Sequence, residues 1–290
     1  MPRANPYAGV IAMRFGSVVS CCRFAFLAVA AFCLGCGGQG GSQPNTGSPK
    51  QPDSAAPAAA SGGNAAATVR PGGTLTGTIV FEGAEVPAQT MVPIATDPEI
   101  CQKHGVDGQY PMEDYVIDRQ TRGIRYVIVN LKSDAIRKWA GTPRQNVVID
   151  NRNCRFEPHV ALATVGSQVE VKNSDDVYHT THLYGPGGFQ YNPGLRAKGE
   201  SEQTELTRPG TYIVKCDRHG WMSAFLRVDD HPFHAVTDEK GRFEIKGIPP
   251  GKHHVEVFHE KFGERPIAPE VIEVNIEADK TSTLDLKLSH

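Results

Sequence analysis

Short runs of β-branched and aromatic residues, several of them alternating with polar residues, dominate the chain from residue 74 onward. A period of two is typical of half-buried β-strands. The pattern predicts strands at 74–81, 124–131, 146–150, 167–172, 211–215 and 224–228. Only residues 134–140 favour a short helix. We therefore expect an all-β fold, with sandwich geometry as the default for many short strands.

A second pattern begins after residue 230, with a hairpin turn "DEKG", a strand "RFEI", a loop "GIPPG" and the alternating stretch "HHVEVFH". This stretch of sequence resembles the carboxypeptidase regulatory-like domain, which implies a small prealbumin-like β-sandwich over residues 231–290. In that family the module is usually a passive accessory. His253, His254 and His259 could bind a metal in principle, but the alternation separates them, so we expect solvent-facing histidines.

Residues 1–36 are typical of an export signal, because Arg14 and Arg23 precede an apolar run at 24–34. That run has 11 residues, whereas a bilayer span needs roughly 20. "LGCGG" resembles the lipobox of bacterial lipoproteins, which implies lipidation of Cys36 and a periplasmic protein anchored to a membrane by its lipid. The alternative is a plain cleaved signal with an incidental cysteine. Met13 is a candidate for the true start.

Some Gram-negative bacteria sort lipoproteins by the residues after the lipidated cysteine, and Gly37 then favours the outer membrane. Residues 37–72 consist largely of Gly, Ser, Pro, Ala, Gln and Asn. Such a segment cannot bury enough apolar surface to offset the entropy of ordering, so we expect a flexible tether.

Three cysteines remain after residue 36, namely Cys101, Cys154 and Cys216. In an oxidising compartment an odd number indicates one disulfide and one free thiol, or an intermolecular bridge. We predict a Cys101–Cys154 disulfide that leaves Cys216 free for chemistry.

Cys216, His219 and Met222 follow the predicted strand 211–215 at even steps of three. A thiolate, an imidazole and a thioether, with one further imidazole, form the blue-copper ligand set. The fourth ligand must come from another strand end. His179 meets this condition, because it follows the strand 167–172 and the polar turn 173–176.

Asn173, His179, "YIVKC" and the spacing Cys-x2-His-x2-Met resemble the cupredoxins, and the short spacing resembles that of the amicyanins. "CRFEPH", "NSDDVYHTTH" and "CDRHGWM" also resemble bacterial secreted proteins described as methylamine-utilisation-protein-like. The resemblance implies a Greek-key cupredoxin sandwich over residues 146–230 and one type 1 copper ion. It further implies single-electron exchange with redox partner proteins through an exposed edge of His219.

Residues 146–229 are few for a complete cupredoxin. We therefore expect strands within residues 73–145 to complete or flank that sandwich.

Two further histidines are weaker candidates. We expect His182 either to contact a ligand residue without binding the metal or to serve as an alternate ligand. We expect His159 to make structural hydrogen bonds, with an alternate ligand role left open. A competing interpretation makes Cys216 and Met222 ordinary core residues.

The formal charge of −2 gives no indication of a nucleic-acid partner. No nucleophile elbow, phosphate-binding loop or zinc-protease signature occurs, so we do not expect an enzyme. Two alternatives to electron transfer stay open: a copper carrier or sequestering protein, and a metal-free scaffold lipoprotein.

Overall fold

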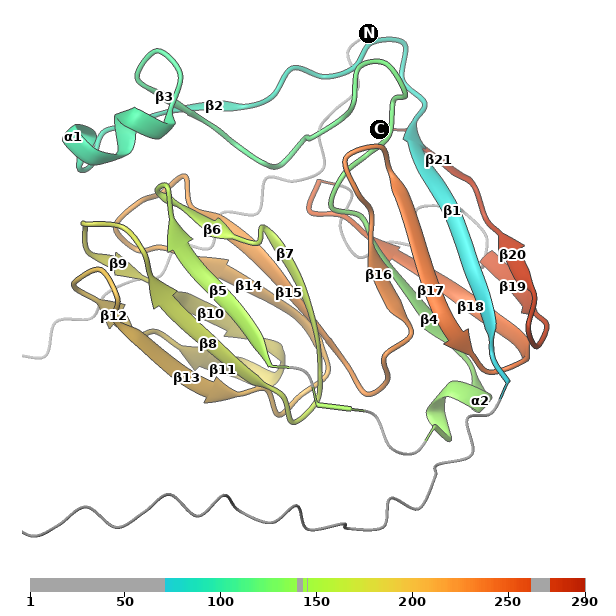
Figure 1. Cartoon of the computed structure of the whole chain (residues 1–290). Coiled ribbons are helices and arrows are strands. Elements are labelled where there is room, and N and C mark those ends of the chain that lie inside the picture. The colour runs from blue at the N-terminus through green and yellow to red at the C-terminus, as the bar shows by residue number, and fades with distance from the viewer. Residues whose placement is uncertain (1–70, 140–142, 145, 262–271, 290) are drawn as a thin grey trace, which may run out of the picture. The chain divides into compact units, whose positions relative to one another are not determined.

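The computed structural model describes residues 71–139, 143–144, 146–261 and 272–289. The signal, the lipidation site Cys36 and nearly all of the tether lie outside the described residues. Within the described part, strands dominate and the helices are short, so the all-β prediction is confirmed (Figure 1). No helix among these residues has the length and apolar character needed to cross a membrane.

The first sandwich is formed by residues 147–229. One sheet has the order β13-β8-β5-β6 and another has the order β11-β10-β14-β15-β7, while β9 pairs with β12. The strands of the first sheet are β5 Val147–Arg152, β6 Arg155–Glu157, β8 Gln168–Asn173 and β13 Ser201–Glu205. The remaining strands are β7 Val160–Thr164, β9 His179–Thr180, β10 His182–Gly185, β11 Phe189–Tyr191, β12 Gly194–Leu195, β14 Gly210–Lys215 and β15 Ser223–Asp229. A 3-10 turn, η2, covers Pro186–Gly188.

The core of this sandwich is formed by alternate residues of its strands. In β8, Val169 and Val171 are fully buried, and in β14, Tyr212 and Val214 are fully buried, so alternate residues of the two sheets meet in one apolar cluster. The pairs β5–β8 and β7–β15 are parallel and the other pairs of the two main sheets are antiparallel.

The second sandwich combines the beginning and the end of the described chain. Its strands are β1 Gly73–Phe81, β4 Ile128–Lys132, β16 His234–Val236, β17 Arg242–Ile248, β18 Gly251–Phe258, β19 Ile272–Ile276, β20 Thr281–Thr283 and β21 Leu286–Leu288. The helix α2, Asp134–Arg137, lies within the predicted helical stretch. Strand β1 pairs with β17, β20 and β21, and β4 lies between β16 and β18.

These pairings correct the expected domain boundaries. The strands β1 and β4 do not complete the first sandwich, because the strands that pair with them all lie within residues 234–288. Residues 147–229 are thus inserted between β4 and β16 of the second sandwich. This arrangement could not be predicted from local sequence patterns, since strand pairing between distant segments leaves no local pattern.

The segment between β1 and β4 contains the small sheet of β2 Met91–Pro93 and β3 Gln109–Pro111. Between these strands lie the helix α1, Pro98–Cys101, and the 3-10 turn η1, Gln102–His104. We expected part of residues 73–145 to flank the first sandwich. This segment is the part concerned, because a disulfide joins it to the first sandwich.

Two histidines expected to face solvent are buried instead. His253 and His259 are each 1% exposed, whereas His254 is exposed. They follow the inward phase of β18, and Nε2 of His253 donates to the Pro249 carbonyl at 2.7 Å. An imidazole that is hydrogen-bonded to a carbonyl can occupy a core position. The expectation of solvent-facing side chains was wrong because it rested on the polar character of histidine alone.

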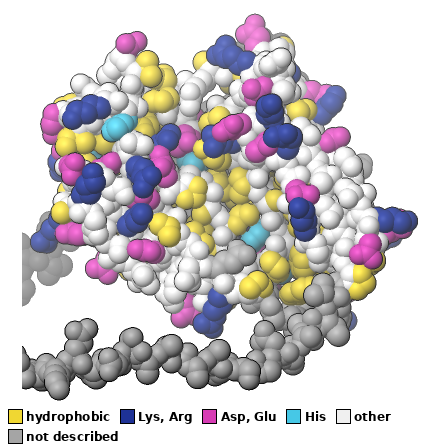
Figure 2. Space-filling model, viewed as in Figure 1, with side chains coloured by type: hydrophobic (Ala, Val, Ile, Leu, Met, Phe, Trp, Pro, Cys, Tyr) yellow, Lys and Arg dark blue, Asp and Glu magenta, His cyan; other side chains and the backbone are white. Residues whose placement is uncertain are grey.

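The surface carries both signs of charge. On the face shown in Figure 2, Lys and Arg side chains are interspersed with Asp and Glu side chains. This distribution fits the small formal charge and gives that face no strong field of one sign.

The topology predicts a localised effect of truncating Ile79 in β1, which is fully buried. Ile79→Ala should lower the free energy of unfolding by about 2–5 kcal/mol, and hydrogen exchange should accelerate in β17 and β21, the strands beside it. Ile213→Ala is the control, because Ile213 is 41% exposed and surface substitutions usually change stability by less than about 0.5 kcal/mol. Faster exchange confined to β8 and β14 would contradict the pairing.

Candidate metal centre

Cys216 points into the core because it continues the alternation of buried and exposed residues in β14. Tyr212, Val214 and Cys216 are buried in succession while Ile213 and Lys215 face out. The loop after Cys216 closes on itself, because the Cys216 amide donates to the Met222 carbonyl at 3.4 Å and the Met222 amide donates to the His219 carbonyl at 2.9 Å. A short loop between two paired strands therefore holds His219 beside Cys216.

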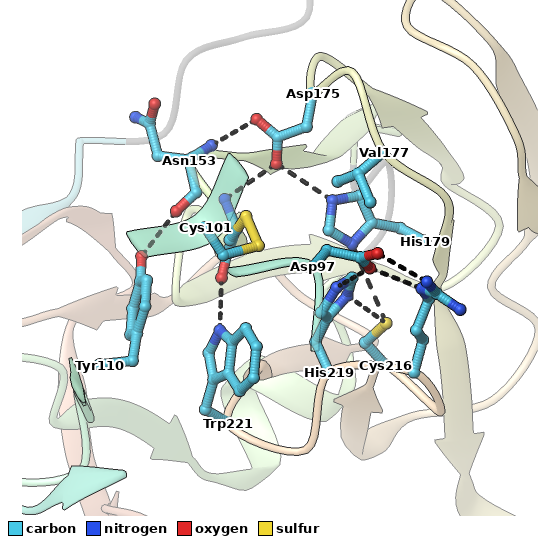
Figure 3. The surroundings of a disulfide bond; sticks show 12 residues. Asp97, Cys101, Tyr110, Asn153, Asp175, Val177, His179, Cys216, His219 and Trp221 are labelled. Carbon is cyan, nitrogen blue, oxygen red and sulfur yellow. Dashed lines mark hydrogen bonds and ion pairs between the residues drawn. A yellow bond between two sulfur atoms is a disulfide. The ribbon is translucent and has the colours of Figure 1, made fainter. Parts of the chain in front are cut away.

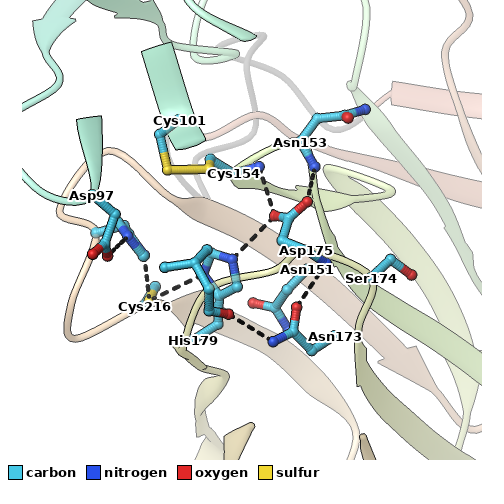
Figure 4. Close-up of polar contacts among 12 residues, drawn as sticks. Asp97, Cys101, Asn151, Asn153, Cys154, Asn173, Ser174, Asp175, His179 and Cys216 are labelled. Carbon is cyan, nitrogen blue, oxygen red and sulfur yellow. Dashed lines mark hydrogen bonds and ion pairs between the residues drawn. A yellow bond between two sulfur atoms is a disulfide. The ribbon is translucent and has the colours of Figure 1, made fainter. Parts of the chain in front are cut away.

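His179 is positioned by the turn that follows β8. Asn173 ends the inward series of that strand, and its side-chain amide donates to the Val177 carbonyl at 2.8 Å (Figure 4). Its side-chain oxygen accepts the Asp175 amide at 2.9 Å. These two bonds span the turn, so the asparagine fixes the path of the chain into β9 and orients His179.

The two strand ends bring three ligand-type side chains together. The potential ligand atoms of His179, Cys216 and His219 lie within 4.8 Å of one another, and all three residues are buried (Figure 3). The Cys216 Sγ lies 3.5 Å from Nδ1 of His219 and 4.0 Å from Nδ1 of His179. Three soft or borderline donors thus converge on one point.

The spacing of these atoms fits a shared metal ion. With metal–sulfur and metal–nitrogen bonds of roughly 2.3 Å and 2.0 Å, donors spread at about 120° lie about 3.7 Å apart. The two observed sulfur–nitrogen distances, 3.5 Å and 4.0 Å, bracket that value. A thiolate with two imidazoles also matches the chemistry of a trigonal copper site.

The far nitrogen of each imidazole is bonded to a carboxylate. Nε2 of His179 donates to Asp175 at 3.0 Å, and Nε2 of His219 donates to Asp97 at 2.9 Å. An ionised carboxylate only accepts hydrogen bonds, so the ring proton lies on Nε2 and, in the neutral ring, the Nδ1 lone pair is free for a ligand. Metal-binding histidines in proteins characteristically have such a partner.

The Cys101–Cys154 disulfide, predicted from the sequence, lies next to this group (Figure 4). Asn153 and Cys154 form the turn between β5 and β6, both at positive φ. Asp175 accepts their amides at 2.7 Å and 2.8 Å. Trp221 donates from Nε1 to the Cys154 carbonyl at 2.9 Å. The turn therefore anchors a residue beside each imidazole.

These contacts favour charge separation in the group. Burial opposes ionisation of Cys216, but the hydrogen bonds with His179 and His219 outweigh it and lower the pKa of the thiol to about 5. For His179, burial works against protonation, but the bonds to Asp175 and Cys216 raise its pKa overall. The thiolate form, which is the metal ligand, is therefore accessible at neutral pH.

The other predicted site residues differ in their surroundings. Met222 is buried in the same core cluster as Cys216 and Trp221. His182 bonds to Asp217 at 3.2 Å and stacks on Tyr184, and His159 bonds to Glu260 at 2.7 Å and to the Ser223 carbonyl at 3.0 Å. Neither histidine joins the ligand group found among the described residues, so the alternate-ligand role is not supported for either.

The structure also corrects the predicted electron exit. His219 is 0% exposed, and its outer ring nitrogen, Nε2, is bonded to Asp97, which Arg218 also binds. Neither Asp97 nor Asp175 was singled out from the sequence. Asp97 precedes Pro98, a pattern typical of an ordinary helix start, and Asp175 stands in a polar turn where carboxylates are common.

Comparisons with known proteins find similarity to parts of solved structures. No family model and no curated protein matches the chain. Among solved structures, the chain is similar to the Cu-containing nitrite reductase NirK from Thermus scotoductus, at 26% identity over 31% of this chain and 24% of that chain, with a TM-score of 0.27. It is also similar to a purple cupredoxin from Nitrosopumilus maritimus, at 24% identity over 29% of this chain and 97% of that chain, with a TM-score of 0.25.

A variant of amicyanin in its Cu(I) form is 19% identical over 34% of this chain and 97% of that chain, with a TM-score of 0.26. The chain thus spans about a quarter of the nitrite reductase that it matches.

The lowered thiol pKa predicts an acidic titration in the metal-free protein. The thiolate absorbance of Cys216, measured as the difference between the native chain and Cys216→Ser, should rise with pH around a midpoint near 5. Below that pH the sulfur is protonated and the difference disappears. A midpoint close to the usual value for cysteine, about 8.5, would show that the two imidazoles do not stabilise the thiolate.

Proposed function

We propose that this chain is an extracytoplasmic copper protein of cupredoxin type that transfers single electrons between redox partner proteins. The observation that supports the proposal best is the buried Cys216 Sγ flanked by Nδ1 of two histidines, each of which is backed by a carboxylate. This group combines a soft thiolate with two oriented imidazoles, which is the donor set of blue-copper sites.

In this proposal His179, Cys216 and His219 would hold one type 1 copper ion, and the thioether of Met222 would be the fourth, weaker ligand. The ion supplies a one-electron couple between Cu(II) and Cu(I). The protein's part is to keep the donors in place, and the burial and hydrogen bonds of the three residues serve that purpose. Donors held in this way need little rearrangement when the charge of the site changes.

Two alternatives use the same residues differently. A copper carrier would hold the ion with these ligands and release it to a receiving protein. A metal-free scaffold would use Cys216 and Met222 as core residues only, as their burial also allows. The polar environment of Cys216, in contact with two histidines and Thr180, favours a site over a simple core position.

The cellular setting is part of the proposal. A lipid on Cys36 and a tether over residues 37–72 would hold the folded part near a bacterial membrane, with the outer membrane favoured. The disulfide is consistent with an oxidising compartment. The role of the second sandwich, which resembles a regulatory-like domain in sequence, is that of an accessory module.

Copper addition tests the proposal. The mature chain with Cu(II) should develop an intense visible thiolate-to-copper band and a paramagnetic resonance spectrum with narrow copper hyperfine splitting. Cys216→Ser should abolish both, because the band requires the sulfur. His254→Asn serves as a matched histidine control, since His254 is exposed on β18.

The outcomes separate the three functions. Reversible reduction without loss of the ion supports electron transfer, and rapid transfer to a chelator on reduction supports a carrier. Absence of both colour and stoichiometric binding in the native chain would refute the copper proposal and favour the scaffold.

A further inference from the structure

Asp97 occupies a helix N-cap without acting as one. It precedes Pro98 at the start of α1, but its side chain makes no capping hydrogen bond. An aspartate in this position normally accepts an amide from the first turn of the helix. Its backbone is also left-handed, with φ 46° and ψ 49°, a conformation that costs energy in a residue other than glycine. The carboxylate is therefore directed to other partners.

Those partners are Arg218 and His219, on the loop that follows Cys216. The Arg218 guanidinium donates from Nε and from Nη2 to the two carboxylate oxygens, each at 2.6 Å. Nε2 of His219 donates to one of the same oxygens at 2.9 Å. The Asp97 side chain is 12% exposed and the His219 side chain 0%. A two-pronged arginine contact fixes the plane of the carboxylate, and the carboxylate in turn fixes the plane of the imidazole.

The backbone of Asp97 is itself anchored. Its carbonyl accepts the amides of Ile100 and Cys101 at 3.1 Å and 2.9 Å, and Cys101 is joined to Cys154. The Cys154 amide donates to Asp175, the carboxylate behind His179. One disulfide thus connects the supports of both imidazoles, as Figures 3 and 4 show.

We propose that Asp97 is a positioning residue for His219, which directs Nδ1 of His219 toward Cys216 and sets the preference of the site between the two copper oxidation states. This inference rests on the proposed copper function. A partly buried negative charge on the far side of a ligand imidazole favours the ion of higher charge. Asp97 therefore lowers the reduction potential of the site. It also closes the ring edge against solvent.

Two substitutions separate orientation from charge. Asp97→Asn keeps an oxygen acceptor for Nε2 and a side chain that tolerates positive φ, but it removes the negative charge. Asp97→Gly removes the acceptor altogether, and glycine adopts the left-handed backbone without strain. Glu99→Gln is the matched control, because it removes the same charge two residues away in α1 from an exposed side chain.

We expect the reduction potential of the mature chain to rise in Asp97→Asn and to change much less in Glu99→Gln. Cu(II) affinity, measured by competition with a chelator, should fall about 10–100-fold in Asp97→Gly, as is typical when a ligand histidine loses its hydrogen-bond partner. In the metal-free chain, His219 should become reactive toward diethyl pyrocarbonate in Asp97→Gly, which peptide mass spectrometry detects.

The inference is overturned if the native chain shows the type 1 spectrum but both Asp97 variants match Glu99→Gln in potential, affinity and His219 reactivity. Should Asp97→Gly fail to fold, the potential of Asp97→Asn alone decides. A native chain that binds no copper refutes the proposed function instead. Acylation of His219 in the metal-free variants then still decides whether Asp97 covers the ring.

Discussion

The disulfide between Cys101 and Cys154 is the constraint on which the candidate site depends. Its two cysteines are 53 residues apart in the sequence. A cross-link over such a distance stabilises the fold chiefly by reducing the conformational entropy of the unfolded chain. Here it also has a local effect, because Cys101 ends the helix that presents Asp97 and Cys154 belongs to the turn that binds Asp175. Two loops from different parts of the chain are thereby tied to the same ligand group.

The topology explains why such a tie is available. The chain starts the second sandwich with β1, crosses to the first sandwich through β2, α1 and β3, and returns to the second sandwich at β4. A segment that leaves one sandwich and comes back must contact its surroundings or remain exposed. The disulfide and the Tyr110 hydroxyl, which donates to the Asn153 carbonyl at 2.8 Å, fasten this segment to the first sandwich.

Local patterns predicted several of the strands and the three donors, but they did not predict contacts between distant segments. The alternation in β8 and β14 indicated which residues face inward, and the same phase delivers Asn173 and Cys216. Strand pairing of β1 with β17 was beyond reach, because an alternating strand fits either sandwich equally well. The burial of His219 was likewise hidden, since it depends on Asp97, a residue 122 positions away.

The two carboxylates behind the imidazoles, one buried and one partly buried, show how a charge that is shielded from water is stabilised by nearby donors. An isolated buried carboxylate would take up a proton or withdraw one from its histidine. Asp97 is compensated by the bidentate Arg218, whose hydrogen bond is foremost in lowering the pKa of Asp97. Asp175 loses solvation on burial, but His179 and two backbone amides compensate, and its pKa is lowered as well.

Because each carboxylate has donors of its own besides the histidine, it stays ionised and acts only as an acceptor. A permanent acceptor on Nε2 means that the ring proton stays there and that Nδ1 is the nitrogen presented to Cys216. The identity of the donor atom is thus decided by residues that never approach the sulfur. Arg218 and the Asn153–Cys154 turn therefore help to determine the geometry of the site, because they hold the carboxylates that orient its two imidazoles.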